Sequence, residues 1–164
     1  MIIRVYESGD LEALGRLHAL SRRHAYAGLL PPEAIERIDA TEMTAGWVRR
    51  FATTDRTYAV LVAETAGGLA GFCMLTLEDG DTAALNAIHV HPDYHGSGLA
   101  PRLHDEAVAL MRAWGCGSAY LWVLVGNDRA QAFYRRRGWV ADGTRDSQSI
   151  GGVDAHILRY ALAL

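Results

Sequence analysis

The most informative segment of the chain is IHVHPDYHGSGLA, at residues 88–100. A strand is expected to end at Val90, a turn contains Pro92, and Gly96 and Gly98 lead into a helix. Glycine lets the backbone approach a phosphate closely, and the first N–H groups of a helix have no acceptor inside the helix. The segment therefore predicts a cradle for an anion, with an ordinary glycine-containing turn as the alternative.

Around this stretch, the sequence predicts a single domain over residues 1–164 in the α/β (α+β) class. Helices are expected at residues 10–24, 33–38, 41–51, 98–114 and 128–137. Strands are expected at residues 2–6, 57–64, 69–78, 83–90, 118–125, 139–141 and 153–161. Gly67-Gly68 indicates a hairpin, and the last two strands are expected to be joined by a loop that contains glycine and aspartate. Hairpins followed by a strand-helix-strand unit predict a mixed sheet flanked by helices.

The composition excludes several kinds of site. All 16 basic side chains are arginines and the chain has no lysine. A P-loop, a pyridoxal-phosphate Schiff base and a protein-kinase site all require a lysine, so none of them can be built here.

Charge and hydropathy restrict the partners and the location. The formal net charge is -3 at pH 7, which argues against nucleic acid and anionic membranes as partners. No apolar run approaches the roughly 18 residues that span a bilayer, and the N-terminus has no signal-peptide pattern. Cys73 and Cys116 are far apart and form no C-x-x-C motif, so we expect reduced thiols and a cytoplasmic protein.

The glycine loop does not fit the fingerprint of dinucleotide-binding proteins. Gly96-x-Gly98-x-x-Pro101 has proline where a third small residue is required. The next expected strand, at residues 118–125, also lacks the acidic residue that would hold a ribose hydroxyl.

Two spaced motifs instead resemble those of the GNAT (Gcn5-related) N-acetyltransferase superfamily. His95, Gly98 and Ala100 occupy the fixed positions of its pyrophosphate-binding signature, Q/R-x-x-G-x-G/A. Asn127-x-x-Ala130-x-x-x-Tyr134, followed by Gly138-Trp139, resembles its second signature. The order of elements along all 164 residues also resembles the family.

The resemblance implies a mixed, mostly antiparallel sheet in which two parallel strands splay apart around acetyl-CoA. Ile88 and Val90 would offer backbone groups to the pantetheine arm, and Asn127 would bind the same region. Tyr134 would be the general acid that protonates the leaving thiolate and would contact the cofactor. The N–H groups that would hold the pyrophosphate are those of Gly96, Ser97, Gly98, Leu99 and Ala100, with His95 beside them.

The chain departs from the family in its phosphate loop and in the general base. His95 replaces glutamine or arginine, so help from its side chain depends on protonation, and Pro101 removes one N–H. Ala84 and Val125 stand where relatives often carry a glutamate.

The general base is therefore unassigned, and His89 is the foremost of several candidates. The others are Glu78, Asp81 and His156. Neither a metal cofactor nor a zinc site at His89, His91 and His95 is expected, because the proline turn redirects the chain after His91 and no cysteine or acidic ligand lies beside them.

The acceptor predicted from the resemblance is a primary amine of a small molecule, or else a protein or peptide amine. Its site would be built from residues 24–32 and 142–152, where Tyr26, Asp142 and Asp146 could contact it, together with Trp47. The alternative function is a non-catalytic CoA-binding module of the same fold, and a homodimer is left open.

Overall fold

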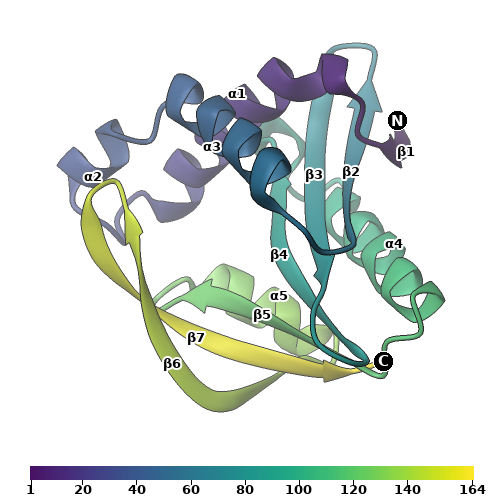
Figure 1. The fold of residues 1–164 in the computed structure, drawn as a ribbon. Coiled ribbons are helices and arrows are strands. Elements are labelled where there is room, and N and C mark those ends of the chain that lie inside the picture. The colour runs from purple at the N-terminus through teal and green to yellow at the C-terminus, as the bar shows by residue number, and fades with distance from the viewer.

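The computed structural model describes residues 1–164 and contains one seven-stranded sheet with helices on both faces (Figure 1). The sheet order is β1-β2-β3-β4-β5-β7-β6. The strands are β1 (Ile2–Val5), β2 (Tyr58–Thr65), β3 (Gly68–Leu77), β4 (Thr82–Val90), β5 (Ser118–Leu124), β6 (Val140–Ile150) and β7 (Val153–Ala163). The α-helices are α1 (Leu11–Tyr26), α2 (Pro32–Glu36), α3 (Ala40–Thr53), α4 (Leu99–Ala113) and α5 (Asp128–Arg136), with 3-10 turns at Ser8–Asp10 and Pro92–Tyr94. The predicted fold class and all predicted helices are confirmed.

Side chains alternate between two faces of the sheet, and each face has its own core. On β2 and β3, Val60, Val62, Phe72 and Met74 pack with α1 and α3 through residues such as Trp47. The intervening residues of the same strands face α4, whose contributions to that core are Leu99, Leu103, Ala107 and Met111. A strand buried on both faces is apolar along its whole length, which is why β3 reads as one continuous apolar run.

None of the helices combines the length and the apolar composition that a membrane span requires.

The parallel strands β4 and β5 pair only at their beginnings. Their register covers Thr82 to Ala84 on β4 and Ser118 to Tyr120 on β5. Beyond these residues the strands separate, and residues 85–90 of β4 face residues 121–124 of β5 across an unpaired space that we call the gap. On the other side of β4, the ladder with β3 skips Asn86, because Met74 pairs with Ala87 and Leu75 with Leu85. An extra residue in one strand bends it and increases its twist, so this bulge explains the splay.

The chain from residue 140 to residue 163 differs from the prediction. Two short strands joined by a loop over residues 142–152 were expected, but β6 runs unbroken to Ile150 and the turn is Gly151-Gly152. That prediction is wrong because β7 pairs with β6 at residues 140–141 and again at residues 145–150, while the polar side chains of this edge strand stay exposed. The polar composition of residues 142–150 therefore reflects an exposed edge strand and not a loop.

The tip of the β6–β7 hairpin closes against α2. Gly151 has φ +58°, and a Cβ there would lie 2.0 Å from the backbone oxygen of Ala34. Arg37 Nη1 donates to the carbonyl of Gly151 at 3.2 Å. This contact brings the hairpin over the same side of the sheet as α1 and α3, and Figure 1 shows the long hairpin reaching α2.

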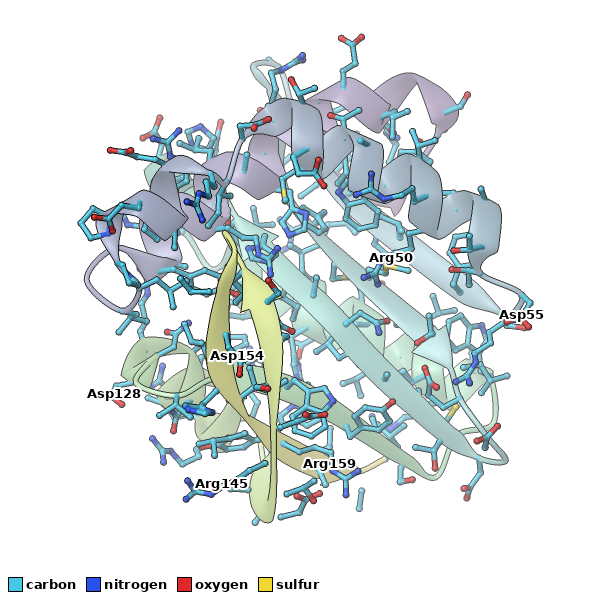
Figure 2. All side chains as sticks on the ribbon, turned by 60° about the vertical axis from the view of Figure 1, so that its left-hand side comes forward. Arg50, Asp55, Asp128, Arg145, Asp154 and Arg159 are labelled. Atoms are coloured by element: carbon cyan, nitrogen blue, oxygen red, sulfur yellow. The ribbon has the colours of Figure 1, made fainter.

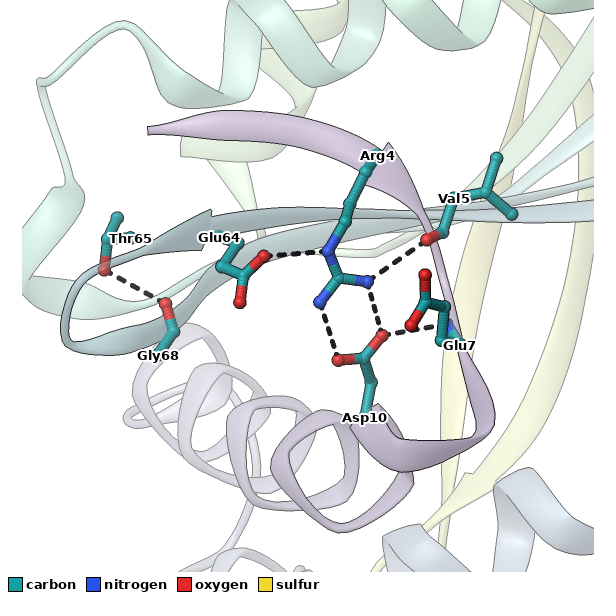
Figure 3. A network of polar contacts seen from close by, with 7 residues as sticks. All are labelled: Arg4, Val5, Glu7, Asp10, Glu64, Thr65 and Gly68. Atoms are coloured by element: carbon teal, nitrogen blue, oxygen red, sulfur yellow. Dashed lines mark hydrogen bonds and ion pairs between the residues drawn. The ribbon is translucent and has the colours of Figure 1, made fainter.

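A network around Arg4 ties β1 to the start of α1 (Figure 3). The Arg4 guanidinium donates two hydrogen bonds to Asp10, at 2.7 and 2.8 Å, and a third to Glu64 at 2.8 Å. Two parallel bonds to one carboxylate fix its orientation. The network lowers the pKa of Asp10, chiefly through the hydrogen bond from Arg4. It thereby positions the helix whose other end reaches the gap.

Candidate functional site

Two pockets meet at the gap between β4 and β5. The loop pocket has a volume of about 560 Å³ and is lined by the 94–101 segment, the open edge of β4, the start of α5 and the end of α1. The helix pocket has a volume of about 430 Å³ and lies between α1, α3, β4 and β5. The two share six lining residues, Tyr26, Leu85, Asn86, Ala87, His89 and Trp122. Molecules bound in the two pockets would therefore touch at the gap.

The loop before α4 presents free backbone N–H groups to the loop pocket. Gly96 and Gly98 have φ of +78° and +82°, a region that L side chains rarely adopt. A Cβ at either glycine would meet no protein atom within 4 Å, so glycine is required by the backbone conformation and not by crowding. The N–H groups with no acceptor in the protein are those of Gly96, Gly98, Leu99 and Ala100. Free N–H groups at a helix N-terminus can hold an anion, so donors are available for the predicted anion cradle.

Ser97 is the exception among the predicted phosphate-binding residues. Its N–H donates to the carbonyl of Tyr94 at 3.2 Å, and its hydroxyl donates to the same oxygen at 2.6 Å. The N–H of Ser97 is therefore already used within the loop, unlike those of the other four residues. The sequence could not show this, because the competing acceptor belongs to a 3-10 turn that precedes the glycines.

His95 holds the loop and supplies no charge to it. Its Nε2 lies 3.2 Å from the carbonyl oxygen of Val90, and its Nδ1 lies 3.0 Å from Arg129 Nη1. A neutral ring protonated on Nε2 satisfies both contacts. Burial, followed by the nearby Arg129, lowers the pKa of His95, so the ring is neutral at pH 7. The positive charges at this pocket are instead Arg129 and Arg136 of α5.

The open edge of β4 carries the predicted pantetheine contacts. The N–H of His91 donates to Ala70 on the β3 side at 2.8 Å. Backbone groups alternate in direction along a strand, so Ile88 and Val90 direct theirs toward the gap. Both residues line the loop pocket. The carbonyl of Val90 is occupied by His95, which leaves its N–H and both groups of Ile88 for a ligand.

Asn127 caps α5 and also lines the loop pocket. Its Oδ1 accepts a hydrogen bond from the N–H of Ala130 at 3.2 Å, which confirms the expected helix cap. The side-chain nitrogen of Asn127, Nδ2, forms no hydrogen bond within the protein, so it can serve a ligand in the same pocket.

Tyr134 is buried at the inner wall of the loop pocket. Its exposed fraction is 9%, and its ring packs against Phe133 and Trp139. Burial is the main cause that raises the pKa of Tyr134, with Tyr26 and Cys73 adding to it. The phenol is therefore protonated at neutral pH and can act as a hydrogen-bond donor.

His89 is the only base candidate of the four that lies at the gap. Its Nδ1 is 2.7 Å from the hydroxyl of Ser21, and its ring stacks on Phe72 and lies 4.8 Å from the ring of His18. Burial, followed by Arg22, lowers the pKa of His89 to about 3. A ring with this pKa accepts a proton poorly at neutral pH, which argues against the base role.

The other base candidates line neither pocket. Glu78 is bound by Thr76 and Arg56 at the far end of β3. Asp81 packs against Gly117, and His156 is exposed on β7. The only carboxylate that lines either pocket is Glu42 of α3, whose Oε1 is 2.8 Å from Arg49 Nη2.

The three histidines of the β4 segment do not gather around a common point. His91 lies against Tyr94 and Asp93, whereas His89 and His95 have the separate partners described above. No group of three His, Cys, Asp or Glu side chains in the structure could share a metal ion.

The residues predicted for the acceptor divide between the pocket and the surface. Tyr26 lines both pockets and Trp47 lines the helix pocket. Asp142 and Asp146 line neither; Asp142 accepts a hydrogen bond from Arg159 at 2.7 Å. Of residues 142–152, only Gln148 reaches the helix pocket, because this segment is a strand.

Several pocket residues were not predicted from the sequence. His18 and Arg22 are four residues apart on α1, so they share one face of that helix, and this spacing could have identified them as a pair. Arg50 comes from α3 and Asn86 from the bulge in β4. No local pattern marks either of these two residues.

This chain is similar to known proteins in both sequence and structure. Residues 23–139 match the sequence model of the acetyltransferase (GNAT) family. An uncharacterized N-acetyltransferase from Mycobacterium tuberculosis is 37% identical over 139 residues, which cover 83% of this chain and 86% of that protein.

Two solved structures share the fold over nearly the whole chain. One is a GCN5-related N-acetyltransferase from Rhodopseudomonas palustris, with a TM-score of 0.81, 24% identity, and coverage of 99% of this chain and 95% of that one. The other is the PaiA N-acetyltransferase of Thermoplasma acidophilum in complex with coenzyme A, with a TM-score of 0.72, 25% identity, and coverage of 97% and 98%.

Proposed function

Because this chain belongs to the GNAT family of acetyltransferases, we propose that it transfers the acetyl group of acetyl-CoA to a primary amine. The observation that carries the proposal is the gap between β4 and β5, where the loop pocket and the helix pocket meet. Acetyl-CoA would occupy the loop pocket and the amine would enter from the helix pocket.

The loop pocket suits coenzyme A in both charge and shape. The pyrophosphate would accept hydrogen bonds from the N–H groups of Gly96, Gly98, Leu99 and Ala100, which are free. Arg129 and Arg136 add positive charge, and no carboxylate lines this pocket. The PaiA neighbour was solved with coenzyme A, which supports the same ligand here.

The pantetheine arm would run along β4 as an additional strand. Its amides would pair with Ile88 and Val90, whose backbone groups face the gap, and with the free amide nitrogen of Asn127. A backbone N–H of this edge would also donate to the thioester carbonyl. Such a donor stabilises the negative charge that develops on the oxygen of the tetrahedral intermediate.

In the transfer step the amine nitrogen attacks the thioester carbon. A C–N bond forms and the C–S bond breaks, so the products are an amide and coenzyme A with a free thiol. Tyr134 would donate its phenolic proton to the departing sulfur. Because burial makes a lasting phenolate costly, the surplus proton of the attacking nitrogen would replace the proton that Tyr134 gives up.

No side chain at the gap has both the position and the pKa needed to remove a proton from the acceptor amine. His89 has a pKa lowered to about 3, and Glu42 is paired with Arg49. We therefore propose that the acceptor binds with its amine already neutral. The dependence of kcat/KM on pH would then follow the pKa of each acceptor amine and not a residue of the enzyme.

The same observation favours a second candidate, a protein of this fold that binds coenzyme A without transferring acetyl groups. An assay of free thiol released from acetyl-CoA, run with a broad panel of amines, separates the two. The proposal predicts thiol release with at least one amine together with an acetylated product of the expected mass. Tight binding of coenzyme A with no thiol release from any amine would favour the second candidate.

A cytoplasmic location completes the proposal. Cys73 and Cys116 are both buried and unpaired, and free thiols are typical of reducing compartments.

A further inference from the structure

We propose that the helix pocket binds an oxyanion of the acceptor, and that the acceptor is a small amine carrying a carboxylate or a comparable oxyanion. This inference rests on the proposed function, since it names the class of amine that the reaction uses. It is based on hydrogen-bond donors and guanidinium charges of the helix pocket that have no partner in the protein.

All the buried side-chain polar atoms that have no hydrogen-bond partner belong to the helix pocket. They are His18 Nδ1, Arg22 Nε and Trp47 Nε1. The arginine and tryptophan nitrogens can only donate. Buried donors are almost always paired in folded proteins, and Trp47 is only 4% exposed. Their concentration in one pocket therefore indicates a ligand that accepts hydrogen bonds.

The charge of the helix pocket points to the same kind of ligand. Its basic side chains are Arg22, Arg49 and Arg50, and Glu42, its only carboxylate, already pairs with Arg49. Neither Arg22 nor Arg50 has a carboxylate partner. Their nearest polar contacts are thioether sulfurs, Met43 at 3.9 Å and Met74 at 3.4 Å, which are weak acceptors.

The two unpaired guanidiniums come from different helices and face the same space. Arg22 lies over the ring of Tyr26 at the end of α1, and Arg50 lies over the ring of Trp47. Figure 2 shows the Arg50 side chain beneath α3, over the sheet. Burial, followed by the proximity of Arg22, lowers the pKa of Arg50. A bound oxyanion would relieve this repulsion by pairing with the two guanidiniums.

The rest of the pocket sets the size and polarity of the acceptor. The volume of about 430 Å³ accommodates a small molecule, and thioether and aromatic side chains form much of the wall. With its oxyanion at Arg22 and Arg50, an amino acid would extend its amine toward the gap. A polyamine would place additional positive charge against both arginines, so we expect it to be a poor acceptor.

The test compares matched acceptors that differ only in the charged group. L-Methionine, L-phenylalanine and L-tryptophan are assayed as free acids and as carboxamides, together with aminomethylphosphonate and putrescine. Rates of thiol release are expressed as kcat/KM and corrected for the fraction of neutral amine. We expect at least one free acid to exceed its carboxamide by about 100-fold, since hydrogen bonds to a charged group are strong and the carboxamide lacks that charge.

Arg50→Gln tests the assignment on the protein side, with Arg16→Gln as the control. Arg50 is classed as an exposed residue and belongs to none of the hydrophobic cores, so the variant should fold. Arg16 lies on the outer face of α1, paired with Glu12. Arg50→Gln should lower kcat/KM for the free acid at least 10-fold and leave the carboxamide unchanged, whereas Arg16→Gln should change neither.

A binding measurement keeps the inference separate from the proposed function. N-acetyl-L-methionine, N-acetyl-L-phenylalanine and N-acetyl-L-tryptophan are titrated in the presence of coenzyme A. Binding of at least one that weakens 10-fold or more in Arg50→Gln would support the oxyanion site even if no amine is acetylated. A preference for aminomethylphosphonate would also support it and assign a phosphonate as the occupant. Equal rates for acids and carboxamides, a preference for putrescine, or binding unaffected by Arg50→Gln would overturn the inference.

Discussion

The loop pocket takes most of its free hydrogen-bond donors from the backbone, at residues 96–100 and along the open edge of β4, whereas the helix pocket takes its polar groups from side chains on α1, α3, β4, β5 and β6. A backbone site depends on glycines at fixed spacing, and any chain with the same turn can form it. A side-chain site depends on how distant elements pack, and it changes with each substitution. The difference indicates that the loop pocket serves a common cofactor and the helix pocket a ligand particular to this protein.

The largest expected effect is at Tyr134, on the inner wall of the loop pocket. Tyr134→Phe should lower kcat by about 100-fold or more, in line with the usual contribution of a positioned acid, while the affinity for coenzyme A changes little. Tyr58→Phe, at an exposed tyrosine on β2 away from both pockets, is the matched control. Steady-state kinetics and calorimetry measure the two quantities, and an unchanged kcat would remove Tyr134 from the acid role.

The next largest effect is expected on the pH dependence of the free energy of unfolding, through the histidines of the helix pocket. In the unfolded chain His89 has a pKa of about 6.5, and in the folded protein the pKa is about 3. Between these values the unfolded state binds more protons, so the free energy of unfolding falls as the pH falls below 6.5. At pH 5 the loss from one such histidine is about 2 kcal/mol.

Urea unfolding at pH 7 and pH 5 checks this expectation. His89→Gln should reduce the loss of stability between the two pH values by about 2 kcal/mol, whereas His156→Gln, at an exposed position on β7, should leave it unchanged. An identical loss in wild type and His89→Gln would mean that His89 is not held neutral by burial.

The backbone character of the loop pocket is tested at Gly98. Gly98→Ala places a side chain at φ +82°, which costs about 1–2 kcal/mol in the left-handed region and displaces the N–H groups at the start of α4. The affinity for coenzyme A should fall about 10-fold, since about 1.4 kcal/mol corresponds to a factor of ten. Gly143→Ala, at φ +86° on β6 and outside both pockets, has the same backbone cost and should keep the affinity.

The smallest effect is expected at Arg129, the side-chain contribution to the loop pocket. Arg129→Gln should weaken coenzyme A binding several-fold and reduce its dependence on salt, because an exposed charge is screened by ions. Arg135→Gln on the same helix, outside both pockets, is the control. If Arg129→Gln weakened binding more than Gly98→Ala, the loop pocket would be a side-chain site and the comparison between the pockets would fail.

What could be predicted from the sequence follows the same division. Gly96, Gly98 and Asn127 lie in motifs with fixed spacing, and these residues fix φ or cap a helix locally, so their places in the loop pocket were predictable. The hydrogen bond of the Ser97 N–H could not be predicted, since its acceptor belongs to a turn that only the three-dimensional structure shows. Arg22 and Arg50 could not be paired from the sequence, because only the packing of α1 against α3 brings them to one pocket.

Calorimetric titration of coenzyme A into the wild-type protein measures whether the loop pocket binds this cofactor. We expect one site per chain, with an affinity that falls about 10-fold in Gly98→Ala and is retained in Gly143→Ala. An absence of binding heat at millimolar coenzyme A, confirmed by the lack of any shift in thermal unfolding, would contradict this expectation.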